Sequence, residues 1–175
     1  EGSLLHGQAH GAGAFEAADG TRYTGQWSQN RAHGFGTCRM PDGSSYEGEW
    51  RDDERSGRGV ECHADGARYE GEFKGNGKHG VGSYESAMGA RYTGQFCNDT
   101  MHGEGAYKFA DGRSYDGQWQ DGYMQGVGTM QWPDGKKYIG SYDHNVVHGQ
   151  GTYYWPNGQT HEGEWCKGQP VLVSI

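Results

Sequence analysis

The feature that most constrains this chain is a frame of 23 residues that recurs from one end to the other. Tyrosine stands at positions 23, 46, 69, 92, 115 and 138, and His161 takes the next place in the series. Self-similarity at a fixed period is typical of repeat proteins, in which each unit packs on its neighbours instead of closing a core of its own. The sequence therefore predicts an array over residues 1–168, with a partial unit at 1–22, further units starting at 23, 46, 69, 92, 115, 138 and 161, and a tail at 169–175.

Each unit has the alternation of a β-hairpin. Tyr23, Gly25 and Trp27 fall on one face of a strand, and the residues between them fall on the other. A second alternating segment follows, and the Asp42-Gly43 pair after it favours a tight hairpin turn. No helical period is visible. The expected fold class is all-β, an elongated single-layer twisted antiparallel β-meander of about seven hairpin repeats.

Glycine accounts for 34 of the 175 residues, which in a sequence without a period would indicate disorder. Here the glycines recur in the same places of every unit. A glycine inside a strand leaves room for a neighbouring aromatic ring to lie over the backbone. Periodic glycine is therefore expected to be part of the architecture.

The charge balance narrows the function classes. Fifteen Lys and Arg against 23 Asp and Glu give a formal net charge of −8, which disfavours nucleic acid and anionic membranes as direct partners and favours a basic protein segment. No stretch has the length of a transmembrane helix, and the first residues are not an apolar signal segment. We expect a cytoplasmic protein, with any membrane association indirect.

Nine histidines and four cysteines raise the question of a metal site or a disulfide. Five of the histidines precede glycine at the same place in their units, so they form a ladder with rungs about 10 Å apart and cannot share one ion. Cys97 and Cys166 are three repeats apart, and Cys38 and Cys62 lie one repeat apart on opposite faces, so all four thiols are expected to stay free. The sequence predicts no cofactor, with a zinc ion shared between chains as the remaining alternative.

Tyr23 to Gly43 closely resembles the MORN repeat, whose pattern is YxGxW followed by HGxGxxxxxDG, and near-complete copies extend up to Gly168. The resemblance implies an antiparallel repeat sheet used as a scaffold and interaction surface and not as a catalyst. A looser resemblance to protozoan cytoskeletal MORN proteins implies association with the cytoskeleton. Because the frame is already under way at the first residue, we also expect that the array begins earlier in the natural protein.

One face of the sheet is expected to carry the aromatic residues. They either fill that face as its core or leave part of it open, because a single sheet without helices has no second layer to cover it. An open aromatic face predicts a groove for a helical or apolar segment of a partner protein. The residues predicted to form this groove are Tyr23, Trp27, Tyr46, Trp50, Tyr69, Phe73, Tyr92, Phe96, Tyr115 and Trp119.

The other face collects acidic residues, among them Glu47, Glu49, Glu70 and Glu72, with Arg or Lys just before several of the tyrosines. Cross-strand ion pairs on a solvated surface account for this pattern, at no more than about 1 kcal/mol each. The alternative is an acidic strip that recruits basic partners.

No catalytic residues are predicted, because no Ser or Cys lies in a nucleophile motif and no glycine-rich loop precedes a helix. The sequence favours a non-enzymatic scaffold in a cytoskeletal or membrane-associated assembly. The competing hypothesis is a phosphoinositide- or membrane-binding module.

The C-terminal end lacks a polar capping unit, and an uncapped sheet edge tends to associate with another. An apolar tail adjoins a cluster of aromatic residues there. We expect a homodimer, although the tail could instead fold back over the last hairpin. The predicted dimer interface consists of Tyr142, Tyr153, Trp155, Trp165, Val171, Leu172, Val173 and Ile175.

Overall fold

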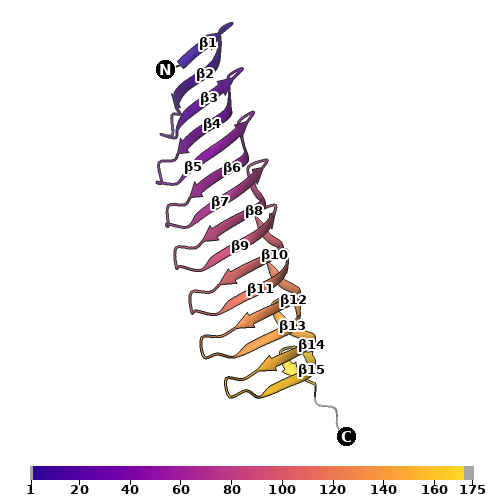
Figure 1. Ribbon diagram of the computed structural model, residues 1–175. Coiled ribbons are helices and arrows are strands. Elements are labelled where there is room, and N and C mark those ends of the chain that lie inside the picture. The colour runs from indigo at the N-terminus through magenta and orange to yellow at the C-terminus, as the bar shows by residue number, and fades with distance from the viewer. Residues whose placement is uncertain (1, 172–175) are drawn as a thin grey trace. The chain divides into compact units, whose positions relative to one another are not determined.

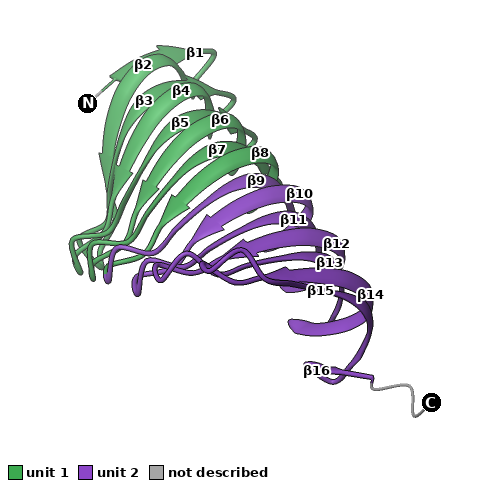
Figure 2. Cartoon of the chain, turned by 60° about the horizontal axis from the view of Figure 1, so that its bottom comes forward, with its two compact units in different colours: residues 1–87 green, residues 88–175 purple. Residues whose placement is uncertain are grey.

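The structure is a computed structural model that describes residues 2–171. It contains two compact units, residues 1–87 and residues 88–175, coloured separately in Figure 2. Within the described residues all regular structure is β-strand, and no helix is present. The all-β class expected from the sequence is confirmed.

The first unit contains eight strands in the order of the sequence (Figure 1). They are β1 (Gly2–Leu5), β2 (Gln8–Glu16), β3 (Arg22–Ser28), β4 (Arg31–Arg39), β5 (Ser45–Arg51), β6 (Glu54–Cys62), β7 (Arg68–Lys74) and β8 (Gly77–Glu85). Each strand pairs antiparallel with the next, so the unit is an open meander.

The second unit has the same organisation. Its strands are β9 (Arg91–Cys97), β10 (Thr100–Lys108), β11 (Ser114–Gln120), β12 (Tyr123–Gln131), β13 (Lys137–Asp143), β14 (Val146–Tyr154), β15 (Thr160–Cys166) and β16 (Gln169–Pro170). Each of these strands also pairs antiparallel with the next. A full repeat thus supplies one strand of 7 residues and one of 9.

Two kinds of turn alternate along the chain. Short turns join the two strands of a repeat, and both of their central residues adopt positive φ, as at Gln29 and Asn30. The Asp-Gly pair, expected in a tight turn, instead lies in a longer loop, where only Gly43 has positive φ, the Met40 N–H donates to the Ser44 carbonyl, and Asp42 accepts the Ser44 N–H. Asn and Asp tolerate positive φ, which explains why they recur in the short turns.

The short turns also connect neighbouring repeats. In the first unit the side-chain oxygen of Asn30 accepts the Ala9 N–H at 2.7 Å, and Asp53 accepts the Ala32 N–H at 2.7 Å. In the second, Asn145 accepts the Met124 N–H at 2.7 Å, and the Asn145 N–H donates to the Met124 carbonyl at 3.0 Å. These hydrogen bonds fix each turn against the strand that lies 21 residues earlier.

The glycine of the recurrent His-Gly pair marks a β-bulge. It adopts positive φ, as does Gly126 at the same position after Gln125, with a φ of 74° close to an irregularity in the pairing of β11 with β12. The polar residue at the fourth position of the repeat stabilises this bulge, because Gln118 Oε1 accepts the Val127 N–H at 2.9 Å. Gln26, Glu49 and Gln95 make the equivalent hydrogen bond in their repeats.

The core of each unit lies on one face of its own sheet. The ring of each repeat tyrosine covers two glycines, so a Cβ built at Gly48 would lie 2.6 Å from the Tyr46 hydroxyl and one at Gly59 2.5 Å from it. The hydroxyl donates to a backbone carbonyl, as Tyr46 does to Glu49 at 2.9 Å. Tyr46, Tyr69, Tyr92 and Tyr138 are fully buried in this way.

Candidate docking surface

The residues predicted to form a partner groove are mostly core residues. Of the ten, Trp27 and Trp50 are half-buried, and the other eight are at most 6% exposed. We call all ten, with Tyr138 and Tyr142, the inner row. In the first unit Tyr23 meets Trp27 and Trp50 edge-on, with ring centroids 5.0 and 5.3 Å apart. Such contacts add about 1 kcal/mol each to the energy of burial, so the inner row holds the repeats together.

Core indoles contribute hydrogen bonds as well as area. Trp50 Nε1 donates to the Gly36 carbonyl at 3.0 Å, and in the second unit Trp119 Nε1 donates to the Gly105 carbonyl at 2.9 Å. Each of these bonds joins a repeat to the preceding one. The inner row therefore offers a partner little free surface or hydrogen-bonding capacity.

A second set of apolar side chains on the same face of the second unit is more accessible. We call it the outer row: Tyr107, Phe109, Met130, Trp132, Tyr153 and Trp155. Met130 is buried, Trp155 is exposed at 36%, and the other four are half-buried. The pairs Tyr107–Phe109 and Tyr153–Trp155 each have ring centroids 4.6 Å apart. The sequence analysis singled out only Tyr153 and Trp155 of this set, and it assigned them to a dimer interface.

A groove of about 500 Å³ lies along part of this outer row, where Tyr107, Phe109, Met130 and Trp132 line it. Its floor includes Trp119 and Tyr142 of the inner row, and its walls include Met101, Met124 and Val147. Arg113 is the one charged residue among the lining side chains, all of which belong to the described part of the chain. The Arg113 guanidinium lies 4.7 Å from the Phe109 ring centroid and is 2.8 Å from Asp111. The groove is thus apolar, with one cation at its margin.

Two indoles of the outer row retain an unused hydrogen-bond donor. Within residues 2–171, the indole N–H of Trp132 and that of Trp155 donate to no protein atom. The buried Trp165 differs, because its Nε1 donates to the Gly151 carbonyl at 3.2 Å. A ligand with free carbonyl oxygens would find matching donors at Trp132 and Trp155.

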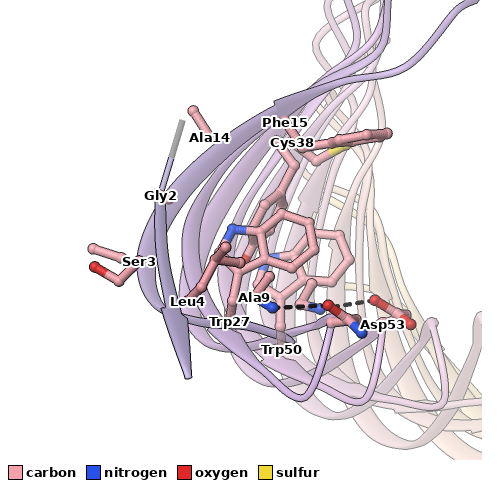
Figure 3. Close-up of a pocket in the computed structure, with 15 residues that line it drawn as sticks. Gly2, Ser3, Leu4, Ala9, Ala14, Phe15, Trp27, Cys38, Trp50 and Asp53 are labelled. Carbon is pink, nitrogen blue, oxygen red and sulfur yellow. Dashed lines mark hydrogen bonds between the residues drawn. The ribbon is translucent and has the colours of Figure 1, made fainter. Parts of the chain in front are cut away.

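The first unit has a hollow of about 610 Å³ near its N-terminal strands (Figure 3). The indoles of Trp27 and Trp50 lie beside each other there, with Leu4, Phe15 and Cys38 around them. The dashed lines in the figure are the turn hydrogen bonds to Ala9 and Ala32. Trp27 and Trp50 are therefore the two accessible members of the predicted groove.

Farther along the first unit the same face is polar. Glu61, at the sequence position where other repeats carry Phe, Tyr or Met, is 9% exposed. It contacts Arg55, Lys78 at 2.6 Å and His63 at 3.2 Å. Burial acts to raise the pKa of Glu61, but the hydrogen bonds and charges of Lys78 and Arg55 outweigh it and hold the pKa below 4.5.

The sequence analysis did not identify this cluster. The signal was available, because the tenth position of other repeats is Ala, Met or Val, and it is basic only at Arg55, in the same repeat as Glu61, and at Lys78, in the next repeat. Arg55 also lies 5.6 Å from the Tyr46 ring centroid and 5.5 Å from that of Phe73. The cluster interrupts the apolar surface of the first unit.

The opposite face carries the acidic residues, as expected. Arg68 lies 2.7 Å from Glu70, and both side chains are about half exposed, so this pair contributes at most about 1 kcal/mol. Glu49 has a structural task in addition, because its Oε1 accepts the Arg58 N–H at 2.9 Å. Acidic side chains at the fourth position thus maintain the bulge.

At the C-terminal end, Tyr142 and Trp165 are buried within the chain, while Trp155 and Val171 are 36% and 42% exposed. Gln169 and Pro170 form β16 and pair with Cys166 and Trp165, and the Val171 N–H donates to the Glu164 carbonyl at 2.7 Å. The tail thus follows the edge of the last hairpin as far as Val171. Leu172, Val173 and Ile175 lie outside the described residues, and the predicted dimer interface is not tested.

The four cysteines are free, as predicted. No group of three or more His, Cys, Asp or Glu side chains in residues 2–171 is placed to hold a metal ion, and a zinc ion shared between chains stays a prediction. In the same residues no helix has the length and apolar character needed to cross a membrane.

In the described residues, consecutive hairpins share an aromatic core, and hydrogen bonds from the turns join one hairpin to the previous one. Together with the absence of helices from these residues, this defines a β-hairpin repeat protein. The chain belongs to the MORN-repeat family. The family model matches residues 1–22, 23–45, 46–68, 69–91, 92–112, 115–137 and 138–160. Comparison with curated proteins finds no match.

Among solved structures, the chain is similar to the TCP domain of SAS-4 (dCPAP) from Drosophila melanogaster, solved in complex with a proline-rich motif of Ana2 (dSTIL). The two are 13% identical with a TM-score of 0.53, over 87% of this chain and 83% of that domain. The CPAP G-box domain also matches, at 14% identity and a TM-score of 0.41, over 88% of this chain and 93% of that one. At these identities the similarity concerns the fold alone.

Proposed function

We propose that this chain is a non-enzymatic scaffold that binds a segment of a partner protein on the aromatic face of its repeats. The observation that carries the proposal is the outer row of the second unit. Four of its six residues line an apolar groove on a sheet face that no other layer of the described chain covers. Exposed apolar surface of this kind is typical of interaction sites.

The fold and the family support this function. The MORN-repeat match covers nearly the whole chain, and the SAS-4 TCP domain with a similar fold was solved with a bound motif of another protein. We also infer a cytoskeletal setting for this chain, because its repeats resemble those of cytoskeletal MORN proteins. A basic partner segment would instead favour the opposite, acidic face.

Site-specific crosslinking tests the proposal. A photoreactive phenylalanine placed at Trp132, on the outer row, should capture a discrete protein from native lysate, and excess unlabelled chain should compete. The matched control is the same residue placed at Val127, which is 57% exposed in the same strand region and pairs with Ser141, outside the groove. Equal capture from both positions, or none from Trp132, would refute an aromatic docking face.

The membrane-binding alternative has a direct test. A chain with net charge −8 should remain in the supernatant when anionic vesicles containing phosphoinositide are sedimented at physiological salt. Strong, salt-sensitive sedimentation of the purified chain would favour the membrane-binding module over the scaffold.

We also propose a homodimer that buries Trp155 and Val171 at the C-terminal end, since both are exposed beside the last hairpin. Light scattering at micromolar concentration should give the mass of a dimer. Deletion of residues 171–175 combined with Trp155→Ala should give a monomer. A monomeric mass for the unaltered chain, or a dimer that survives both changes, would contradict the proposal.

A further inference from the structure

The outer row has a spacing that restricts what can lie along it. Its aromatic positions recur once per repeat, at Phe109, Trp132 and Trp155, which follow β10, β12 and β14. A repeat advances by two strands, and neighbouring strands lie about 4.8 Å apart, so equivalent rings recur about every 9.6 Å across the sheet. A segment that uses all three rings must present a side chain at the same interval.

Three backbone conformations can be compared with this interval. A polyproline II helix has three residues per turn and rises 3.1 Å per residue, so every third residue returns to the same side after about 9.3 Å. A β-strand covers about 10 Å in three residues, but its third residue points to the opposite face. An α-helix needs seven residues, which span about 10.5 Å. Polyproline II gives the closest match with the shortest segment.

The free indole donors of the outer row separate the polyproline II helix from the α-helix. Of the two, Trp132 lines the groove, and Trp155 lies beyond its lining. A polyproline II segment makes no internal hydrogen bonds, so all its carbonyls can accept from a partner. The carbonyls of an α-helix are already occupied, except in its last turn. Trp132 and Trp155 offer indole N–H groups that no atom in the described chain accepts, one repeat apart. Indole N–H donors that recur once per repeat can therefore pair with the free carbonyls of a polyproline II segment.

The lining of the groove agrees with an occupant rich in proline. Rings of Tyr107, Trp119 and Tyr142 and the thioether of Met101 surround the space. Proline-rich segments dock in aromatic-lined grooves, and their low conformational entropy limits the cost of binding. Because the one charged lining residue is Arg113, the groove has no carboxylate that would select a basic segment.

We infer that the outer row of the second unit binds a proline-rich partner segment in the polyproline II conformation, with one residue in three seated against successive repeats. The inference rests on the proposed docking function and adds the class of the partner. Trp132 donates its indole N–H to a carbonyl of the segment. Trp155 lies at the end of the row, where the proposed dimer would bury it, so Trp132 is the residue to test.

The test uses the full chain and synthetic peptides, with binding measured by calorimetry. The first peptide has proline at every third position, alanine elsewhere, and enough length to cross three repeats. The second has the same composition with its prolines grouped at the two ends. The third is an amphipathic helix of equal length. The first peptide should bind, the second at least about fivefold more weakly, and the third not measurably.

Two matched variants locate the site. Trp132→Phe keeps an aromatic ring and removes the indole N–H, so affinity for the first peptide should fall about fivefold, the value of one neutral hydrogen bond. Tyr123→Phe removes one ring donor from an exposed residue of β12 that does not line the groove, and it should leave the affinity unchanged.

Each other outcome has a defined meaning. Equal binding of the two proline peptides, or an affinity unaffected by Trp132→Phe, would overturn the inference. Binding of the helical peptide alone, with crosslinking still specific to Trp132, would overturn the polyproline II partner and retain the docking function. If no peptide binds and Trp132→Phe lowers the mass of the particle, the row is a contact between copies of the chain and the inference fails.

Discussion

At the scale of single residues, each tyrosine and the two glycines beneath it form one packing unit. The tyrosine ring occupies the space in which a glycine Cβ would stand, and its hydroxyl donates to a carbonyl of the same strand. This arrangement gives a single-layered sheet a core without a second layer. The last repeat is a natural exception, because His161 replaces tyrosine above Gly163.

That exception provides a matched pair of substitutions. A Cβ at Gly117 would lie 2.4 Å from the Gly128 Cα, 2.6 Å from the Val127 carbonyl oxygen and 2.8 Å from the Tyr115 hydroxyl, whereas one at Gly163 meets only His161 Nε2, at 3.5 Å. Gly117→Ala should lower the free energy of unfolding by about 2 to 3 kcal/mol, and Gly163→Ala by less than about 0.5 kcal/mol. Urea denaturation measures both, and equal losses would show that the close packing of the next strand and the tyrosine against Gly117 is not the cause.

The cluster around Glu61 leads to a second prediction. Glu61→Gln leaves Arg55 and Lys78 largely buried without a counter-charge, which should cost about 2 kcal/mol. The triple change of Arg55, Glu61 and Lys78 to Met makes the cluster apolar, as at the equivalent positions of the second unit, which are Met124, Met130 and Val147. Because apolar replacement of a buried ion cluster is usually neutral or stabilising, the triple variant should be at least as stable as the unaltered chain.

The pH dependence of unfolding provides a further readout of the cluster. The folded-state pKa of Glu61 is lowered below 4.5, so its contribution is present above that pH and is lost as pH falls through the folded value. Both variants should lack this part of the acid limb. An unchanged acid limb in Glu61→Gln would show that the carboxylate does not stabilise the fold.

At the scale of elements, the short turn is the unit that joins one hairpin to the previous one. Its second residue both adopts positive φ and accepts a backbone N–H from the preceding repeat, as Asn145 does. Asn and Asp meet the two requirements together, because their short side chains accept a hydrogen bond and tolerate the left-handed region. This double use explains why Asn30, Asp53, Asn76 and Asn145 recur at the same position.

Substitution of Asn145 tests this role. Asn145→Ala loses the hydrogen bond to the Met124 N–H and places an alanine at a φ of 69°, which together should cost about 2 kcal/mol. Asn145→Asp retains an acceptor, as Asp53 does in the first unit, and should be tolerated. Hydrogen exchange at the Met124 amide should accelerate in the alanine variant alone. Equal exchange in both variants would contradict the assigned role.

At the scale of the whole molecule, stability should depend on keeping the repeat tyrosines neutral. Burial raises the pKa of Tyr23, Tyr46 and Tyr92 to about 12, and raises those of Tyr115, Tyr138 and Tyr142 as well. A raised folded-state pKa means that the stability is fully present below the ordinary value near 10 and is lost as pH rises toward the folded value.

We therefore expect steep alkaline unfolding. Between about pH 10 and pH 12 each tyrosine that ionises in the unfolded chain favours unfolding, and the contributions of successive repeats add. Tyrosinate absorbance and circular dichroism, recorded on one sample, should change together. Ionisation of most tyrosines near pH 10 with the strand signal intact would contradict this expectation.

The sequence by itself determined the fold class, because hairpin geometry is local. Alternation of residues sets the strand faces, and the return of Tyr, Gly and Trp every 23 residues sets the pairing of one hairpin with the next. Spacing alone also excluded disulfides among the four cysteines, which are free in the structure. These inferences need only the separation of residues in the sequence.

Only the tertiary structure decided which aromatic side chains remain available. The sequence predicted Tyr115 for the partner groove and did not single out Trp132, yet the first is buried over its glycines and the second lines a groove with a free indole donor. Likewise, the sequence alone gives no reason for a carboxylate at Glu61 in an apolar position, whereas the structure shows that Arg55 and Lys78 pair with it. The burial of a side chain and its hydrogen-bond or ion-pair partners depend on contacts between strands of different repeats. The repeat period does not specify which of two neighbouring side chains covers the other.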